Sequence, residues 1–273
     1  MAFAILQDMS KCMACKACQV ACKEWNELPA VETTNEGGYE NPRDLSPTTW
    51  TRIQFLETEA EGAPRWLFYK QQCMHCTNAP CVEACPTGAL KNHPLGFVSF
   101  ERDLCNGCGY CVKFCPYGIP RLDTENALTG RAKVSKCTLC EDRVTQGEIP
   151  ACVKACPPGA IQFGERKELL ASGKARVAQL QAQGVSGANL YGEKELGGLG
   201  VMYVLPDPPS TYKGALPADP ERSWWLASFW QRILQPAGAI GLVLGALGLA
   251  LNFAVVSRRT RGRNQAGREK GDE

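Results

Sequence analysis

The chain has 273 residues and a formal net charge of +2, from 30 lysines and arginines against 28 aspartates and glutamates. Residues 257–273 carry six basic and three acidic side chains, so the rest of the chain has a net charge of −1 and no basic footprint for a nucleic-acid partner. Sixteen cysteines are unusual outside small disulfide-rich secreted proteins, and their spacing indicates what they bind.

The cysteines fall into four groups of four along the chain, and none is left over. The groups are Cys12, Cys15, Cys18 and Cys22; Cys73, Cys76, Cys81 and Cys85; Cys105, Cys108, Cys111 and Cys115; and Cys137, Cys140, Cys152 and Cys156. A C-x2-C pair recurs in every group, and two cysteines at that spacing can direct both sulfurs at one bound ion or cluster. This spacing favours metal ligation over disulfides.

Two features favour an iron–sulfur cluster over zinc, although zinc ribbons also use C-x2-C pairs. The first and third groups follow the pattern C-x2-C-x2-C-x3-C, and the last three groups end in Cys-Pro, at Cys85, Cys115 and Cys156. This is the bacterial ferredoxin run, in which the fourth cysteine ligates the other cluster of a pair, and we expect that cysteine where a helix begins. Sixteen thiolates at four per cluster predict four [4Fe–4S] clusters.

The groups that start at Cys73, Cys105 and Cys137 are spaced at equal intervals of 32 residues, as expected for a duplicated ferredoxin unit. Longer gaps follow Cys76 and Cys140. We interpret them as loops that cover a cluster, with contact to a partner as the alternative. His75 is interpreted as a structural or outer-shell residue rather than a Rieske-type ligand, because a full cysteine set surrounds it.

The predicted elements between and after the cysteine groups are short. Residues 49–70 predict a β-hairpin with a glycine in its loop, and residues 96–100 and 160–164 predict one short strand each after a Cys-Pro ending. Residues 165–183 predict a helix that stops at Gly184. A brief strand and then a Pro-rich extended stretch follow, which either lies on a partner or is a simple linker.

The C-terminal part predicts a transmembrane helix. Residues 237–256 are twenty residues with Asn252 as the one polar member, which span roughly 30 Å as a helix, the thickness of a bilayer core. Trp224, Trp225 and Trp230 predict an interfacial belt. Gly241 and Gly245 predict a small-residue face on which another helix packs, with filler in a glycine-rich span as the alternative.

Flanking charge predicts the orientation of this helix. The basic residues that follow it are Arg258, Arg259, Arg261, Arg263, Arg268 and Lys270. They place the tail in the cytoplasm and the cysteine-rich body outside. The N-terminus has neither the charged region nor the apolar run of a signal peptide, so we expect a body that folds in the cytoplasm and is exported with a partner's signal. The alternative is that the body stays inside.

Nearly the whole chain resembles the iron–sulfur (beta) subunits of membrane-bound formate dehydrogenases. The resemblance is carried by CKACQVACKEWN, ENPRDLSPTTWTRIQF, CTLCEDRVTQGEIPACVKACPPGAI, LYGEKELGGLGVMYVL and the C-terminal span. It implies an electron-transfer subunit between a molybdenum or tungsten pterin catalytic (alpha) subunit and a haem-bearing, cytochrome b-type membrane (gamma) subunit that passes electrons to quinone. The cysteine groups alone specify a wider family, which also serves other molybdopterin reductases and some hydrogenases.

The resemblance also implies a crossed ligation, in which the first group shares clusters with the fourth and the second with the third. The implied ligand sets are Cys12, Cys15, Cys18 and Cys156; Cys22, Cys137, Cys140 and Cys152; Cys73, Cys76, Cys81 and Cys115; and Cys85, Cys105, Cys108 and Cys111.

The expected fold class is α+β, with duplicated ferredoxin-like lobes and one C-terminal transmembrane helix. The expected domains are a double ferredoxin-like domain (1–165, outer lobe about 1–60 and 131–165, inner lobe about 61–130), a helix and extended partner-contacting segment (166–222), the membrane helix with its flank (223–257) and a basic cytoplasmic tail (258–273). We find no G-x-G-x-x-G motif and no nucleophile beside a base, and the membrane span has no histidine for haem, which favours a relay in the cytoplasmic membrane over a catalyst. A membrane-tethered zinc or structural module is the remote alternative.

Overall fold

The structure is a computed structural model that describes residues 2–35, 37–60, 62–126, 128, 130–212 and 215–268, with no side-chain description for residue 60 or for residues 259–268. The chain divides into two compact units, Met1–Ser228 and Phe229–Glu273. We describe each unit by itself.

The centre of the first unit is a four-stranded sheet in the order β8-β1-β10-β9. Its strands are β1 (Phe3–Asp8), β8 (Ile161–Glu165), β9 (Asn189–Tyr191) and β10 (Val201–Leu205). β1 pairs in parallel with β10 and antiparallel with β8. Both central strands are nearly continuous apolar runs, which is the pattern of strands covered on both faces.

Each face of this sheet packs against a different part of the chain. On one face, Leu6 and Met202 pack with Leu169 and Leu180 of α6 (Arg166–Ala182). The side chains that alternate with them, such as Ile5 and Tyr203, point to the opposite face and join the main core, which contains several of the cysteines. The sheet therefore anchors the cysteine-bearing loops on one side only.

Within the described ranges, three two-stranded hairpins accompany the sheet. They are β2 (Arg52–Ala60) with β3 (Ala63–Gln71), β4 (Leu90–Asn92) with β5 (Val98–Phe100), and β6 (Arg121–Asn126) with β7 (Arg131–Ser135). These confirm the hairpin predicted over residues 49–70. The strands predicted at 96–100 and 160–164 are confirmed as β5 and β8, and the predicted helix over 165–183 is α6.

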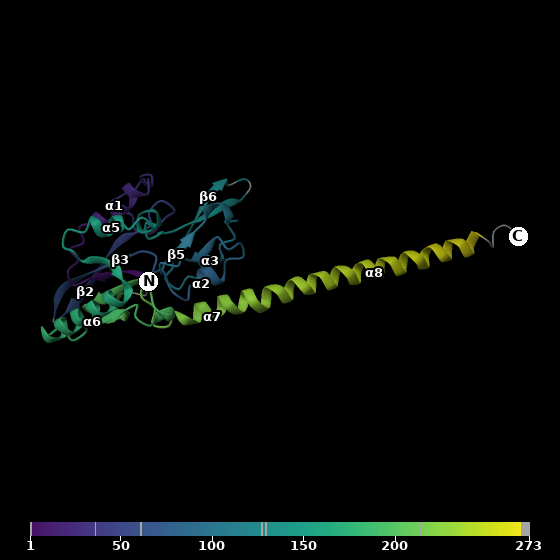
Figure 1. The fold of residues 1–273 in the computed structure, drawn as a ribbon. Helices are drawn as coiled ribbons and strands as arrows, with labels where there is room; N and C mark the ends of the chain where they lie inside the picture. The colour runs from purple at the N-terminus through teal and green to yellow at the C-terminus, as the bar shows by residue number, and fades with distance from the viewer. Residues whose placement is uncertain are drawn as a thin grey trace. The chain divides into compact units, whose positions relative to one another are not determined.

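The remaining helices of the first unit are short. They are α1 (Ala17–Trp25), α2 (Pro80–Glu83), α3 (Tyr110–Phe114), α4 (Glu141–Val144) and α5 (Ala151–Lys154), with 3₁₀ turns η1 (Arg102–Leu104), η2 (Glu195–Gly197) and η3 (Pro209–Tyr212). α1 lies beside α5, and α2 lies beside α3 (Figure 1). Elements far apart in the sequence are therefore paired in space.

The Pro-rich stretch after β10 packs on the body. Tyr212 in η3 is 1% exposed and Leu216 is 3% exposed, and both belong to the main core. The Tyr191 hydroxyl donates to the Pro217 carbonyl at 2.8 Å. Because these side chains are buried, the stretch is fixed against the rest of the first unit and is not a simple linker. Contact with a partner stays a prediction.

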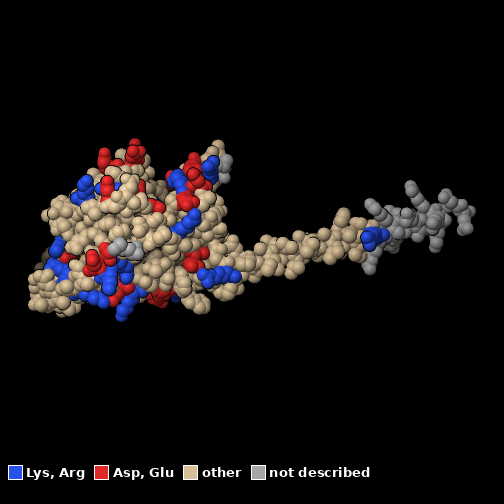
Figure 2. All heavy atoms as spheres, in the orientation of Figure 1, with Lys and Arg blue, Asp and Glu red and all other residues tan. Residues whose placement is uncertain are grey.

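The chain continues from the body into one helical run, formed by α7 (Glu221–Phe229), the π-helical turn η4 (Trp230–Leu234) and α8 (Gln235–Arg268). Its 38 residues Glu221–Arg258 are long and apolar enough to cross a membrane. We call this run the apolar helix; it has no charged residue between Arg232 and Arg258, and Figure 2 shows an uncharged stretch along it. Trp224 of the predicted belt packs partly against the body's core, whereas Trp225 is exposed. Of the predicted basic tail, the side chains of Arg259, Arg261, Arg263 and Arg268 and all of Lys270 lie outside what the structure describes.

Candidate cluster-binding site

Every cysteine-bearing loop contains a left-handed residue directly before its second cysteine. The four residues are Ala14 (φ 54°), His75 (φ 48°), Gly107 (φ 75°) and Leu139 (φ 60°). This conformation costs a residue other than glycine about 1–2 kcal/mol. The third loop needs its glycine for a second reason, because a Cβ on Gly107 would lie 2.3 Å from the Ala132 carbonyl oxygen. The repeated turn gives all four C-x2-C loops a similar local form.

The third cysteine of each group is the second residue of a short helix. These cysteines are Cys18 in α1, Cys81 in α2, Cys111 in α3 and Cys152 in α5. The fourth cysteine follows four residues later, one helical turn on, so it lies inside α1 (Cys22) or at or just after the end of the other helices (Cys85, Cys115, Cys156). The expectation that the fourth cysteine lies where a helix begins was wrong, because the third one takes that position.

Helix pairing brings cysteines of different groups together. Because α1 lies beside α5, the third and fourth cysteines of the first group approach those of the last group. The same holds for α2 and α3, which join the second and third groups. One helical turn separates the third from the fourth cysteine, which lets them face two neighbouring spaces.

The first cavity is lined by Cys12, Cys15, Cys18 and Cys156. Ile53 and Lys70, which face each other across the β2–β3 hairpin, line it too. We call these four cysteines the first set.

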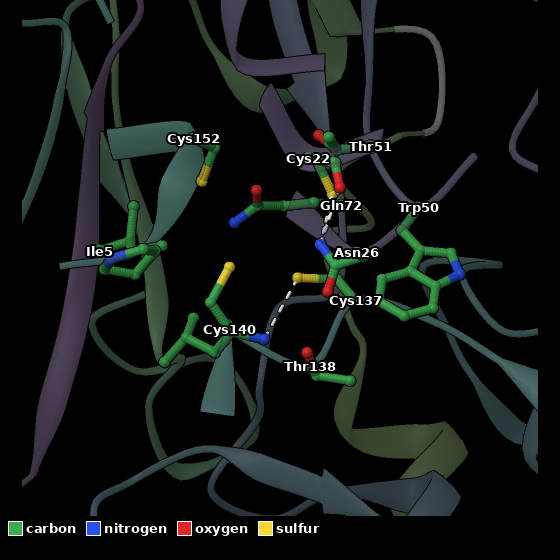
Figure 3. A pocket seen from close by; sticks show the side chains of 12 residues that line it. Ile5, Cys22, Asn26, Trp50, Thr51, Gln72, Cys137, Thr138, Cys140 and Cys152 are labelled. Atoms are coloured by element: carbon green, nitrogen blue, oxygen red, sulfur yellow. Dashed lines mark hydrogen bonds between the residues drawn. The ribbon is translucent and has the colours of Figure 1, made fainter. Parts of the chain in front are cut away.

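The second cavity is lined by Cys22, Cys137, Cys140 and Cys152, the second set. Their sulfur atoms point toward one space, with the Gln72 amide among them (Figure 3). The Asn26 side-chain amide donates to the Cys22 sulfur at 3.7 Å, and the Leu139 amide donates to the Cys137 sulfur at 3.4 Å. Donors of this kind suit sulfurs that carry negative charge.

The other eight thiols also separate into two sets of neighbours. Burial raises the pKa of Cys76 well above its usual range, and the nearby thiols of Cys73, Cys81 and Cys115 raise it further. These four form the third set. The pKa of Cys111 is raised to about 12 by burial and then by the thiols of the remaining cysteines, which complete the fourth set: Cys108, Cys105 and Cys85. These groups of neighbouring thiols have the same members as the ligand sets that the sequence resemblance implies, and ligation of one cluster by each set stays a prediction.

Thiol neighbours link each set to the next, and we call this succession of sets a line. Burial raises the pKa of Cys18 to about 12, and Cys152 of the second set adds to the shift. The pKa of Cys137 is likewise raised by burial and then by Cys73 of the third set. Burial and then neighbouring thiols, including Cys111 of the fourth set, raise the pKa of Cys81. The order is therefore first, second, third and fourth set.

Solvent reaches this line at its two ends. All sixteen cysteines are described, and the exposed ones are Cys15 in the first set and Cys108 in the fourth. Every other thiol is buried or half-buried. A group bound by the middle sets is thus shielded from water by the protein.

Three buried basic side chains lie among the cysteines. Lys136 is 2% exposed, and its Nζ donates to the carbonyls of Val98 and Cys137 at 2.8 and 3.0 Å. His75 accepts the Val98 amide proton at Nδ1 over 3.1 Å, and burial, then Lys136, holds its pKa well below the usual range. The Lys70 Nζ has no hydrogen-bond partner in the part of the chain that the structure describes. The sequence analysis predicted a structural or outer-shell role for His75 but missed both lysines.

The long gap between Cys140 and Cys152 folds against α1. Arg143 lies over the Trp25 ring at 4.1 Å, and its Nε donates to the Ile149 carbonyl at 2.7 Å. Pro150 lines the second cavity. This supports the prediction that the gap covers a cluster.

The donor set fits an iron–sulfur cluster in its chemistry. Thiolates are soft ligands, and a four-iron cluster takes four of them around a volume larger than one ion. In the described ranges, no three His, Cys, Asp or Glu side chains lie close enough together to hold a single metal ion. Each of the two cavities instead brings four cysteines together in its lining.

Comparison with known proteins gives the same chemistry. Two models of a 4Fe-4S dicluster domain match residues 11–89 and 64–166. The chain is 46% identical over 251 residues to the iron-sulfur subunit of the nitrate-inducible formate dehydrogenase of Escherichia coli K12, which covers 91% of this chain and 83% of the relative. It is 44% identical over 249 residues to the formate dehydrogenase iron-sulfur subunit of Haemophilus influenzae, covering 90% of this chain and 77% of that one. The hydrogenase-2 operon protein HybA of Escherichia coli O157:H7 is 34% identical over 230 residues, covering 73% of this chain and 69% of HybA.

Proposed function

This chain belongs to the family of formate dehydrogenase iron–sulfur subunits and binds multiple [4Fe–4S] clusters, and from that premise we propose that it relays electrons between two other subunits of a formate dehydrogenase. The proposed donor is a formate-oxidising molybdenum or tungsten pterin subunit. The proposed acceptor is a haem-bearing, cytochrome b-type membrane subunit that reduces quinone. We further propose four clusters, one for each of the four cysteine sets.

The observation that carries the proposal is the line of four thiol sets with an exposed cysteine at each end. A bound cluster supplies one-electron transfer without bond making or breaking. The protein's own part is to hold the thiols at fixed positions, to keep water from the middle sets and to leave Cys15 and Cys108 accessible to partners. A line with two accessible ends suits a relay with one donor and one acceptor.

The body's last residue suggests the direction of the relay. Ser228 ends the first unit, and its hydroxyl donates to Glu83 of α2 at 3.2 Å. α2 carries Cys81 of the third set, and the apolar helix continues the chain from this point. We propose that the third and fourth sets face the membrane subunit and that electrons enter at the first set, near Cys15.

The proposed membrane arrangement follows the charge of the sequence. The apolar helix spans the cytoplasmic membrane, the tail from residue 258 lies in the cytoplasm and the body lies outside. The predicted lobes (1–60 with 131–165, and 61–130) remain part of the proposal, as does partner contact by residues 166–222. The sheet joins β1 to β9 and β10, so the segment after residue 165 is also built into the body.

A second candidate is the same relay role in a hydrogenase complex, favoured by the similarity to HybA. The identity to the two formate dehydrogenase subunits is higher and covers more of the chain. The candidates differ in the catalytic partner, and the zinc or structural module differs from both in its metal content.

The test is anaerobic purification of the complex from gently solubilised native membranes. We expect about sixteen iron atoms and as much acid-labile sulfide per chain, together with a large pterin subunit and formate-dependent dye reduction. Stoichiometric zinc with little iron would refute the cluster assignment. Hydrogen-dependent instead of formate-dependent dye reduction would select the hydrogenase relay.

A further inference from the structure

Lys70 is a buried basic side chain, and the proposed relay does not by itself explain why it is buried. It lies near the end of β3 and is 1% exposed, and its Nζ has no hydrogen-bond partner in the ranges that the structure describes. Burying an ammonium group without an anionic partner is costly. A group of opposite charge is therefore expected close to it.

The hairpin fixes the direction of the Lys70 side chain. Successive side chains of a strand point to opposite faces. Tyr69 packs against Tyr203 of the sheet, with ring centroids 5.1 Å apart, so Lys70 points the other way. There it lines the first cavity together with Ile53, its neighbour across the hairpin. The Tyr203 hydroxyl also donates to the Lys70 carbonyl at 2.9 Å, which holds the backbone in place.

Lys70 also lies close to the second set. It interacts electrostatically with Cys18 of the first set and with Cys22, Cys137 and Cys152 of the second. Gln72, two residues further along the same segment, lines the second cavity. Lys70 thus lines the first cavity and lies near thiols of the second set.

Lys136 provides the contrast within the same protein. Its ammonium group is equally buried, but two backbone carbonyls accept its protons. Lys136 therefore has a structural explanation, whereas the anionic groups expected near Lys70 are the thiols of the first and second sets.

We propose that the positive charge of Lys70 acts on both the first and the second cluster and raises the reduction potentials of both. This inference rests on the proposed function, in that the two sets hold [4Fe–4S] clusters. A cluster with four thiolate ligands is anionic and gains one further negative charge when it accepts an electron. A fixed cation nearby stabilises the reduced form more than the oxidised form, so its removal lowers the potential.

The experiment compares four variants in the whole complex: Lys70→Met, Lys70→Gln, Lys70→Arg and the exposed control Lys174→Met. Iron is counted first, and the midpoint potentials are then measured by anaerobic redox titration followed by EPR. In the Met and Gln variants, we expect the ratio of reduced to oxidised cluster at a fixed potential to fall about tenfold for two clusters. This fall corresponds to a midpoint potential lower by about 59 mV for a one-electron couple. The Arg variant and the control should keep the wild-type potentials.

Assignment of the shifted signals uses Cys15→Ala and Cys140→Ala, which remove a ligand from the first and second sets. The shifted signals should be those that these two variants lose. Wild-type potentials in Lys70→Gln would overturn the proposal, because a hydrogen-bond donor without charge would then suffice. Equal shifts of all four clusters, or no shift at all, would overturn it too.

Loss of clusters is also informative. Loss of about eight of sixteen irons in the Met and Gln variants, with full iron in Lys70→Arg, would support a requirement for the charge. Loss in all three Lys70 variants would show that only the packing of the lysine matters, which contradicts the proposal. A wild-type complex with fewer than four clusters would instead reject the proposed function, so the two failures are distinguishable.

Discussion

Replacing Cys156 by alanine tests how the chain distributes its thiols between cavities. Cys156 belongs by sequence to the group of Cys137, Cys140 and Cys152, but in space it lines the first cavity with Cys12, Cys15 and Cys18. If the cavities are the cluster sites, the substitution removes one ligand from the first set and none from the second. We expect a loss of about four of about sixteen irons, a quarter of the total.

The assay groups variants by the EPR signal that each one loses. Cys156→Ala and Cys15→Ala, although 141 positions apart in the chain, should lose the same signal. Cys140→Ala should lose a different one, and Cys22→Ala should behave like Cys140→Ala. Iron and acid-labile sulfide are measured on the same anaerobic samples, so that partial loading is not mistaken for loss of a particular cluster.

The opposite grouping would refute the reasoning. If Cys156→Ala lost the signal that Cys140→Ala loses, each sequence group would hold its own cluster and the shared cavities would have no bearing on ligation. Loss of all four signals would show that Cys156 is needed for folding of the whole body, which the separate third and fourth sets argue against.

Three further outcomes are expected. Gly107→Ala should lower the free energy of unfolding by about 1–2 kcal/mol for its left-handed backbone and by about 1–3 kcal/mol more for the overlap with a carbonyl oxygen. The control Gly147→Ala, with φ 80° and nothing within 4 Å of the new Cβ, should show only the first cost in thermal unfolding, and equal losses would contradict this. Arg143→Ala removes the contact with Trp25 and a buried hydrogen bond, so we expect about 2–4 kcal/mol of destabilisation. On exposure of this variant to air, the EPR signal that is missing in Cys140→Ala should be the first to bleach. A chain ending at Ser228 should remain in the soluble fraction without detergent and keep full iron, and membrane association of that chain would show that the apolar helix is not the anchor.

The elements that the sequence predicted well are those with a local signal. The hairpin of β2 and β3 has alternating side chains and a glycine in its loop, and the C-terminal helix has an uninterrupted apolar run. The cysteine spacing and the family resemblance together anticipated which thiols would be neighbours. Each of these depends on residues that are close in the chain or on a pattern already known.

What sequence reasoning missed depends on distant partners or on unusual backbone. β1 was not predicted, because its partner β10 lies nearly two hundred residues later and neither strand signals the other. The left-handed backbone at Ala14, His75 and Leu139 had no glycine to mark it. Lys70 ends the range of the predicted hairpin, and nothing near it in the sequence signals that it is buried in the lining of the first cavity.

The nested order of the cysteine sets has a consequence for synthesis on the ribosome. The third and fourth sets are complete once the chain has grown to Cys115, but the first set waits for Cys156. β1, next to the first set in the chain, waits still longer, until β10 has emerged at Val201–Leu205. Contacts between segments so far apart form slowly. A chain that stalls midway would thus have complete third and fourth sets of thiols and an incomplete first set.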